Sequence, residues 1–270
     1  MVVQDNGGGN DTSLIQTFTI TVDAVNDPPS FSNLGNQTLS TWTNSPQTVN
    51  NWANTFIFGP VDENTQTVAD FLVNVTSGNT LFTTPPDIAD DGTLTYTPTG
   101  EAGTATISVQ LQDNGGTTNG GNDTSTAATF TITIPPPTVN LGVIPNSGSE
   151  AGTSTITITA TAAGPVFGNQ TLNLALSGTA DNSDFSTPIP TQITIPDGAT
   201  TGSVTVTIAQ DSIAEGDETA TFTISNPTAG IQLGTTTNAS FTITEDDTAG
   251  ITITPISVTT TEAGVRLILP

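Results

Sequence analysis

The chain has 270 residues and a formal net charge of −24, because 25 Asp and Glu residues face a single basic residue, Arg266. Nucleic acids and anionic membranes are bound through Lys and Arg, so the sequence predicts neither partner. The absence of Cys and His also excludes disulfides, Cys/His zinc sites, Cys nucleophiles and a Ser-His-Asp triad.

The apolar content sets further limits. No apolar run approaches the roughly 18 residues of a membrane-spanning helix, so no direct membrane insertion is expected. The first five residues lack the basic and apolar regions of a signal peptide, and none is expected in this stretch. A hydrophobic fraction of 33% with this charge would favour disorder. The regular pattern of the apolar residues argues against disorder.

Apolar residues alternate with Thr along most of the chain, which is typical of half-buried antiparallel strands. Gly, Asn, Asp and Pro separate the runs and indicate turns, and no stretch has a helical period. The fold class predicted is therefore all-β, with tandem antiparallel β-sandwiches. The predicted strands are residues 17–22, 129–134, 155–159, 192–195, 203–208, 219–224 and 240–244.

Internal repeats indicate the domain organisation. Asp-Asn-Gly-Gly occurs at residues 5–8 and 113–116, starting 108 residues apart, and Glu-Ala-Gly occurs at 150–152 and 262–264, starting 112 apart. Each period is about one sandwich domain, and Pro residues near 28 and 135–137 mark the joints. The predicted parts are a C-terminal remnant (1–26), a complete repeat (27–136), a second, different domain (138–248) and the first strands of another such domain (249–270).

Residues 138–248 resemble a Calx-beta domain, and a second such domain starts near residue 249. The resemblance is carried by Ser-Glu-Ala-Gly, Gly-Thr-Ala, Ser-Asp-Phe, Ile-Pro-Asp-Gly-Ala, Asp-Ser-Ile-Ala-Glu-Gly-Asp-Glu, Ser-Asn-Pro and Glu-Asp-Asp-Thr-Ala-Gly, at residues 149–152, 178–180, 183–185, 195–199, 211–218, 225–227 and 245–250. Residues 27–136 are similar to the cadherin-like or Ig-like repeats of large bacterial surface adhesins, through Val-Asn-Asp-Pro-Pro, Gly-Thr-Leu-Thr-Tyr-Thr-Pro and Asp-Asn-Gly-Gly.

The Calx-beta resemblance implies Ca²⁺ bound by carboxylates at one end of a sandwich. The matching acids are Glu150, Asp184, Asp211, Glu215, Asp246 and Asp247, with Asp217 and Glu245 as further candidates. Gln210 departs from the family pattern, because metal-binding members often carry an acid at this position.

The chemistry of these acids agrees with that implication. Ca²⁺ takes six to eight oxygen ligands, and sandwich loops converge at one end of the domain. Two carboxylates 4 Å apart repel by about 4 kcal/mol at an effective dielectric near 20, and a cation offsets this. The alternative is that the acids are scattered turn and capping residues in water.

Other polar residues have two possible interpretations, as Ca²⁺ ligands or as turn residues. Asp113, Asn114, Asn122 and Asp123, and the pairs at residues 26–27 and 62–63, carry oxygens that suit Ca²⁺. Asn-Gly and Asp-Gly are, however, also ordinary hairpin turns.

The function expected is that of a calcium-binding structural or adhesive repeat in a large secreted or cell-surface protein, with roles in cell adhesion or cell communication. Its expected partners are Ca²⁺, neighbouring domains of the same longer chain, and cell-surface proteins or glycans. No enzyme activity is expected. The alternatives are a spacer without metal and a carbohydrate-active module with paired carboxylates, which the two Trp and one Tyr residues disfavour.

Overall fold

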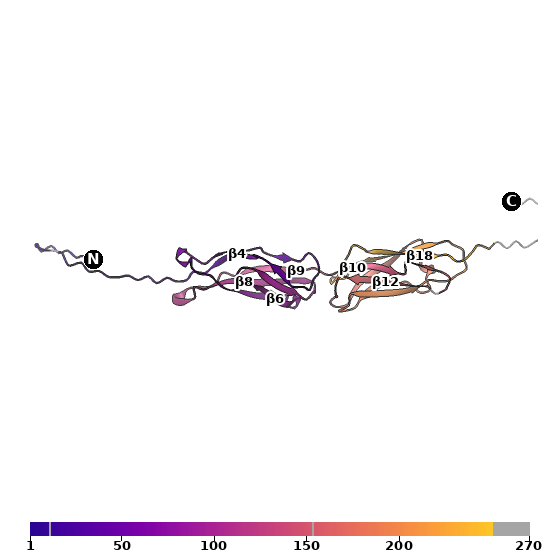
Figure 1. Ribbon diagram of the computed structural model, residues 1–270, viewed down its shortest axis with the longest axis horizontal. Helices are drawn as coiled ribbons and strands as arrows, with labels where there is room; N and C mark the ends of the chain where they lie inside the picture. The colour runs from indigo at the N-terminus through magenta and orange to yellow at the C-terminus, as the bar shows by residue number, and fades with distance from the viewer. Residues whose placement is uncertain (11, 153, 251–270) are drawn as a thin grey trace, which may run out of the picture. The chain divides into compact units, whose positions relative to one another are not determined.

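The computed structural model describes residues 1–10, 12–152 and 154–250. The chain divides between Pro135 and Pro136 into two compact units, called unit 1 and unit 2 here (Figure 1). The regular elements of the described residues are β-strands and four 3₁₀ turns of three residues each. The predicted all-β fold is confirmed.

Unit 1 consists of three sheets. The largest has the strand order β2-β9-β8-β5, and the others are β3-β7-β6 and the pair β1-β4. The pairs β5–β8 and β8–β9 are antiparallel, whereas β2 joins β9 in parallel. The strands are β1 Ser30–Asn33, β2 Gln37–Thr38, β3 Gln47–Val49, β4 Ala53–Ile57, β5 Val68–Ser77, β6 Phe82–Ile88, β7 Leu94–Pro98, β8 Gly103–Asp113 and β9 Ala128–Ile134.

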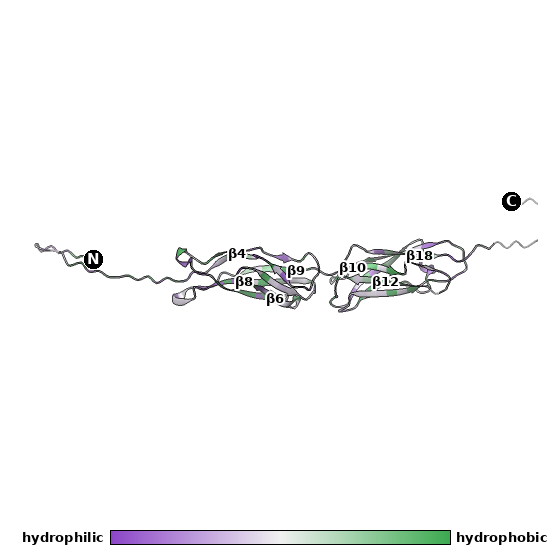
Figure 2. Cartoon of the chain, viewed as in Figure 1, coloured by the Kyte–Doolittle hydropathy of each residue, from purple (hydrophilic) through white to green (hydrophobic). Residues whose placement is uncertain are grey.

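The core of unit 1 follows from the alternation along its strands. In β9, Phe130, Ile132 and Ile134 are buried, while the intervening Thr residues face outward. The outward rows pair across strands, as when the Thr104 and Thr133 hydroxyls lie 3.1 Å apart. Apolar positions on the strands are green in Figure 2. The inner rows pack around Trp52, which is fully buried and packs against Phe130 with ring centroids 4.3 Å apart and ring planes tilted by 43°.

Unit 2 is a sandwich of two sheets, with strand orders β15-β12-β10-β17 and β11-β18-β16-β13-β14. One core lies between them, with Phe222 and Phe241 among its fully buried side chains. The strands are β10 Thr138–Ile144, β11 Ser147–Ser149, β12 Thr155–Ala162, β13 Gln170–Gly178, β14 Gln192–Ile195, β15 Thr201–Thr207, β16 Glu218–Ser225, β17 Gln232–Leu233 and β18 Asn238–Thr244.

One parallel pair in unit 2 positions the candidate site. The chain passes from one sheet to the other between β10 and β11, and β11 then runs parallel to β18 with Ser149 opposite Thr244. Because parallel strands end at the same edge, the residues that follow them, Glu150 and Glu245, leave the sandwich side by side.

The sequence repeat near the N-terminus is also a structural repeat. In unit 1, Leu111 N–H donates to Ser125 Oγ at 2.9 Å, and Ser125 N–H donates to the Leu111 carbonyl at 2.9 Å. Val3 and Ser13 exchange the same two hydrogen bonds, at 3.0 and 2.9 Å. The two Asp-Asn-Gly-Gly segments therefore form the same corner.

One predicted strand is wrong. Residues 17–22 have no strand structure, and Phe18, Ile20 and Val22 are exposed. Their sequence matches that of β9, but a strand exists only where a neighbour accepts its backbone hydrogen bonds, and the described residues place none beside it. The strands expected in residues 251–270 lie outside the described residues. The other six predicted strands fall within β9, β12, β14, β15, β16 and β18, give or take one terminal residue.

Candidate metal centre

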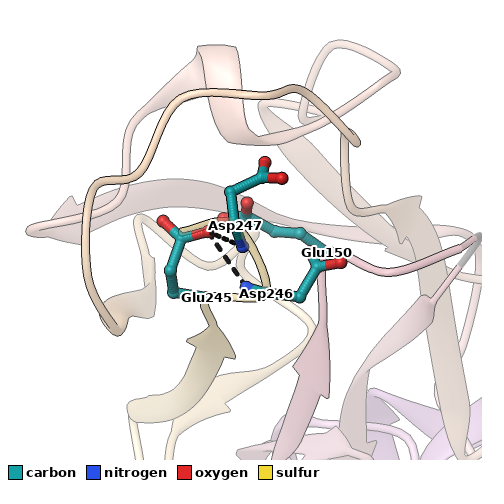
Figure 3. Close-up of side chains that lie close together, drawn as sticks. All are labelled: Glu150, Glu245, Asp246 and Asp247. Carbon is teal, nitrogen blue, oxygen red and sulfur yellow. Dashed lines mark hydrogen bonds between the residues drawn. The ribbon is translucent and has the colours of Figure 1, made fainter. Parts of the chain in front are cut away.

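Acidic side chains gather at the end of unit 2 where β11 and β18 finish. Oxygen atoms of Glu150, Glu245, Asp246 and Asp247, one from each, all lie within 4.8 Å of one another. These four residues are called the Glu150 cluster, and Figure 3 shows them around the end of β18. The parallel pairing of β11 and β18 explains why Glu150 lies close to the acids that follow β18. Glu150 N–H donates to the Thr244 carbonyl at 3.2 Å.

Glu245 organises the backbone of this end. Its Oε1 accepts from Asp246 N–H at 2.9 Å and from Asp247 N–H at 2.6 Å, the two dashed contacts of Figure 3. Its Oε2 accepts from Glu215 N–H at 2.6 Å and Gly216 N–H at 3.2 Å. These backbone hydrogen bonds, that of Glu215 first, hold the pKa of Glu245 below its usual range. The carboxylate is therefore ionised and fixed in place.

Glu150 is the buried member of the cluster. Only 5% of its surface is exposed, and its Oε2 has no hydrogen-bond partner in the protein. Burial raises the pKa of its carboxyl, and neighbouring charges raise it further, those of Glu245, Asp211, Glu215 and Asp246. A second buried oxygen in the cluster, Asp247 Oδ2, also lacks a partner, and burial followed by the charge of Asp246 raises the pKa of Asp247.

A second group of acids is formed by Asp184, Glu215 and Glu218, called the Glu218 cluster, again with one oxygen each within 4.8 Å. Asp184 ends the 3₁₀ turn Asn182–Asp184 and accepts from Asp181 N–H at 2.6 Å through Oδ2. Glu218 begins β16, and its Oε2 is buried without a partner. Burial, a hydrogen bond with Asp184 and the charges of Asp184 and Glu215 raise the pKa of Glu218 to about 7.

The loop between β15 and β16 connects the two clusters. Glu215 belongs to the Glu218 cluster, while its N–H binds Glu245 of the Glu150 cluster. Asp217 Oδ1 accepts from Glu245 N–H at 3.2 Å. Burial raises the pKa of both Glu150 and Glu215, and the charge of Asp211 raises both further. The two clusters therefore share one electrostatic environment.

Of the eight acids singled out in the sequence, six belong to one cluster or the other: Glu150, Asp184, Glu215, Glu245, Asp246 and Asp247. Asp211 and Asp217 belong to neither, although both lie beside them. Gln210 uses its side-chain oxygen to accept from Gly152 N–H at 3.0 Å, so it ties two loops together. Glu218 was missed, although it is the last acid of residues 211–218, because it coincides with the first position of a strand.

The donor set fits a hard divalent cation. The two clusters contain seven carboxylates, three of which, on Glu150, Glu218 and Asp247, have a buried oxygen without a partner. No Lys or Arg lies among the described residues, because the chain's only one is Arg266. Ca²⁺ is coordinated by six to eight oxygen ligands, carboxylates among them, in a flexible geometry. A bound cation would be coordinated by the unpartnered oxygens and would offset the repulsion between the carboxylates.

No helix within the described ranges is long and apolar enough to cross a membrane. No protein-family model matches the chain. No curated protein matches it either.

Several solved structures are similar to the chain. The apo form of the Calx CBD1 domain shares 18% identity with it, covering 41% of this chain and 99% of that one at a TM-score of 0.33. The Yersinia pseudotuberculosis adhesin InvE shares 16%, covering 80% of this chain and 58% of that one at a TM-score of 0.32. Domains 4 and 5 of the S-layer protein SbsC share 16%, with 65% and 76% covered and a TM-score of 0.27.

Proposed function

We propose that the chain is a calcium-binding structural repeat segment of a large extracellular or cell-surface protein, in which Ca²⁺ stiffens the acidic end of unit 2. The observation that carries the proposal is Glu150, a carboxylate 95% buried among other acids with one oxygen unpartnered. Burying an unpaired charge is unfavourable unless the charge is neutralised or bound by a metal.

The arrangement of the acids favours Ca²⁺ over Mg²⁺. The Glu150 cluster contains four carboxylates on the adjoining ends of two strands, which suits an ion with many oxygen ligands and tolerant geometry. Mg²⁺ demands near-ideal octahedral geometry and usually keeps several waters, with one or two carboxylates. The Glu218 cluster offers a second position for a cation in the same end of the unit.

Calcium at this end would act on the chain that leaves unit 2. Glu245 immediately follows β18, and its side chain holds the next two residues, Asp246 and Asp247, through their N–H groups. Without a cation the acids repel one another and loosen these loops. In this proposal residues 27–136 and 138–248 are repeats that serve as stiff spacers, with neighbouring domains of the chain, cell-surface proteins or glycans as partners in adhesion or cell communication.

Isothermal titration calorimetry of the whole chain with Ca²⁺ tests the proposal. The parent is expected to bind with a dissociation constant of roughly 10⁻⁴ to 10⁻³ M, the range of extracellular modules. The double variant Glu150→Gln/Asp247→Asn keeps side-chain size and removes two charges, so it should lose the heat of Ca²⁺ binding at the Glu150 cluster.

The matched control is Asp197→Asn. Asp197 is an acid of unit 2 outside both clusters, and it accepts from Gly168 N–H through Oδ1, which Asn can also do. This variant should bind Ca²⁺ as the parent does. If the parent and the double variant give the same titration, the Glu150 cluster binds no Ca²⁺ and the proposal is wrong.

A further inference from the structure

Gly directly follows Asn or Asp at five places in the chain. These dipeptides are Asn6–Gly7, Asp91–Gly92, Asn114–Gly115, Asn119–Gly120 and Asp197–Gly198. Because Gly has no Cβ, its backbone nitrogen can approach the side-chain carbonyl carbon of the preceding residue with little steric hindrance. The surroundings of each Gly nitrogen then decide whether it can attack that carbon.

Four of these five Gly N–H groups are engaged in hydrogen bonds. The acceptors are Asp5 Oδ1 for Gly7 at 2.7 Å, the Ala89 carbonyl for Gly92 at 2.7 Å, Asp113 Oδ1 for Gly115 at 2.9 Å and the Val166 carbonyl for Gly198 at 2.8 Å. Each hydrogen bond must break before the nitrogen can attack, so each one slows the reaction.

Asn114 is held by further contacts. Its Oδ1 accepts from Thr67 N–H at 3.0 Å, and its own N–H donates to the Thr67 carbonyl at 3.2 Å. A Cβ at Gly115 would lie 2.0 Å from Asn26 Oδ1, so the backbone here is closely packed. Attack by Gly115 would require a rotation of the Asn114 backbone that these contacts oppose.

Asn119–Gly120 lies in the loop between β8 and β9 and lacks such restraints. Within the described residues, neither the Gly120 N–H nor the Asn119 side chain makes a hydrogen bond, and both residues are exposed. A Cβ at Gly120 would meet nothing within 4 Å. Asn119 has a φ of +58°, which is uncommon for a residue other than Gly. The turn is closed by the bond from Gly121 N–H to the Thr118 carbonyl, at 3.1 Å.

We propose that Asn119 is a self-modification site of the folded chain, whereas Asn6 and Asn114 are protected. The Gly120 backbone nitrogen attacks Cγ of Asn119 and forms a new C–N bond. The bond from Cγ to the side-chain nitrogen breaks, and that nitrogen leaves as ammonia with the proton that Gly120 loses. Water then opens the cyclic imide at one of its two carbonyls, which gives aspartate or isoaspartate.

Either product changes the loop permanently. Both add one negative charge, and isoaspartate also adds a methylene group to the backbone. The loop continues to Asn122, whose N–H donates to the Asn26 carbonyl at 2.9 Å and whose carbonyl accepts from Asn26 Nδ2 at 3.0 Å. The modification therefore falls beside the segment by which the chain enters unit 1, and its extent increases with the age of the folded protein.

Mass spectrometry of the whole chain tests this site, with Asn114 as the internal control. The folded chain is incubated at mildly alkaline pH, and samples are digested with pepsin at acidic pH, which stops the reaction. Tandem mass spectra of peptides that span residues 113–122 assign the mass gain to one Asn or the other. Asn119 should convert at least about tenfold faster than Asn114, because the hydrogen bonds of Asn114 and Gly115 must break first.

Two controls separate structure from local sequence. In concentrated urea the two Asn-Gly-Gly segments should react at rates within about threefold of each other, because the contacts that protect Asn114 are lost. Trp fluorescence shows whether unit 1 is folded in each sample, since both Trp residues, at positions 42 and 52, precede Pro136. Asn119→Gln makes ring closure slower through its longer side chain and should suppress the mass gain at this position.

Two results would overturn the proposal. One is an equal rate of conversion at Asn114 and Asn119 in the folded chain. The other is an Asn119 that converts at least about tenfold more slowly in the folded chain than in urea, because the fold would then protect it as well.

Discussion

The backbone N–H of Glu215 donates to Oε2 of Glu245 at 2.6 Å, although the two residues are 30 positions apart. Glu215 lies in the loop between β15 and β16, and Glu245 directly follows β18. The contact brings a loop and a strand end, each rich in acids, to the same place. The acidic side chains at this end of unit 2 therefore repel one another unless a cation lies between them.

The first prediction concerns Asp211 and Glu215, whose charges raise the pKa of Glu150. The double variant Asp211→Asn/Glu215→Gln should lose most of the Ca²⁺-dependent rise in the unfolding temperature of unit 2, since two candidate ligand charges are gone. In chelator it should be no less stable than the parent, because repulsion is relieved. Differential scanning calorimetry with and without Ca²⁺ measures both. A metal-free variant clearly less stable than the parent contradicts the repulsion argument.

The second prediction is a pH dependence. The pKa of Glu218 rises from 4.5 to about 7 in the folded protein, first through burial and then through Asp184. The folded state therefore favours the protonated form. The resulting stabilisation is fully present below pH 4.5 and is lost as pH rises through about 7. In chelator, unit 2 should unfold at a lower temperature at pH 8 than at pH 5.

The variant Glu218→Gln tests the cause of this pH dependence. It mimics the protonated carboxyl, so the difference between pH 5 and pH 8 should shrink, whereas Asp197→Asn should keep it. Scanning calorimetry at several pH values measures the change. An unchanged profile in Glu218→Gln would assign the effect to other acids of the site.

The third prediction compares two glycines of unit 2 that both have a positive φ. A Cβ at Gly178 (φ +118°) would lie 2.0 Å from the Thr219 carbonyl oxygen, whereas one at Gly198 (φ +72°) would meet nothing within 4 Å. Gly178→Ala should lower the free energy of unfolding by about 3 kcal/mol or more, through strain and a backbone clash. Gly198→Ala should cost about 1 kcal/mol. Urea unfolding followed by far-UV circular dichroism measures both, and equal costs would contradict the close approach of Thr219 to Gly178.

The fourth prediction uses the two copies of the corner near Asp-Asn-Gly-Gly. Ser125 is 4% exposed, and its Oγ accepts from Leu111 N–H, while Ser13 makes the same bond to Val3 in an exposed setting. Ser125→Ala leaves a buried N–H without a partner and should cost about 1–3 kcal/mol. Ser13→Ala should change the free energy of unfolding by less than about 0.5 kcal/mol. Urea unfolding followed by Trp fluorescence measures unit 1 in each variant.

Much of the fold could be predicted from period-two alternation. In β16, Ala220, Phe222 and Ile224 are buried while the Thr residues between them are less so. Alternation reports the two faces of a strand, but not whether a neighbouring strand is present. Residues 17–22 have the pattern of β9 and no strand structure, because backbone hydrogen bonds to a partner are a tertiary property.

The candidate site was only partly visible in the sequence. Runs of acids such as residues 245–247 stand out in an almost cation-free chain, and they predicted where charge would gather. Glu218 did not stand out, because an acid at this position is as easily interpreted as an exposed residue at the start of a strand as it is as a metal ligand. Glu63 was singled out as part of the pair at residues 62–63, whereas Gln66 was not, because single polar residues in a turn are common.

By itself, the sequence of this chain determined the all-β class, through alternation, and the chemistry of its sites, through a composition of acids without Lys, Cys or His. Tertiary structure alone decided which acids meet. The parallel pairing of β11 with β18 puts Glu150 beside Glu245, and the path of the chain into unit 1 puts Glu63 and Asp113 around Asn26. The physical reason is that burial and proximity, which leave one oxygen of Glu150, Glu63 and Asp113 without a partner, arise only when distant strands pack together.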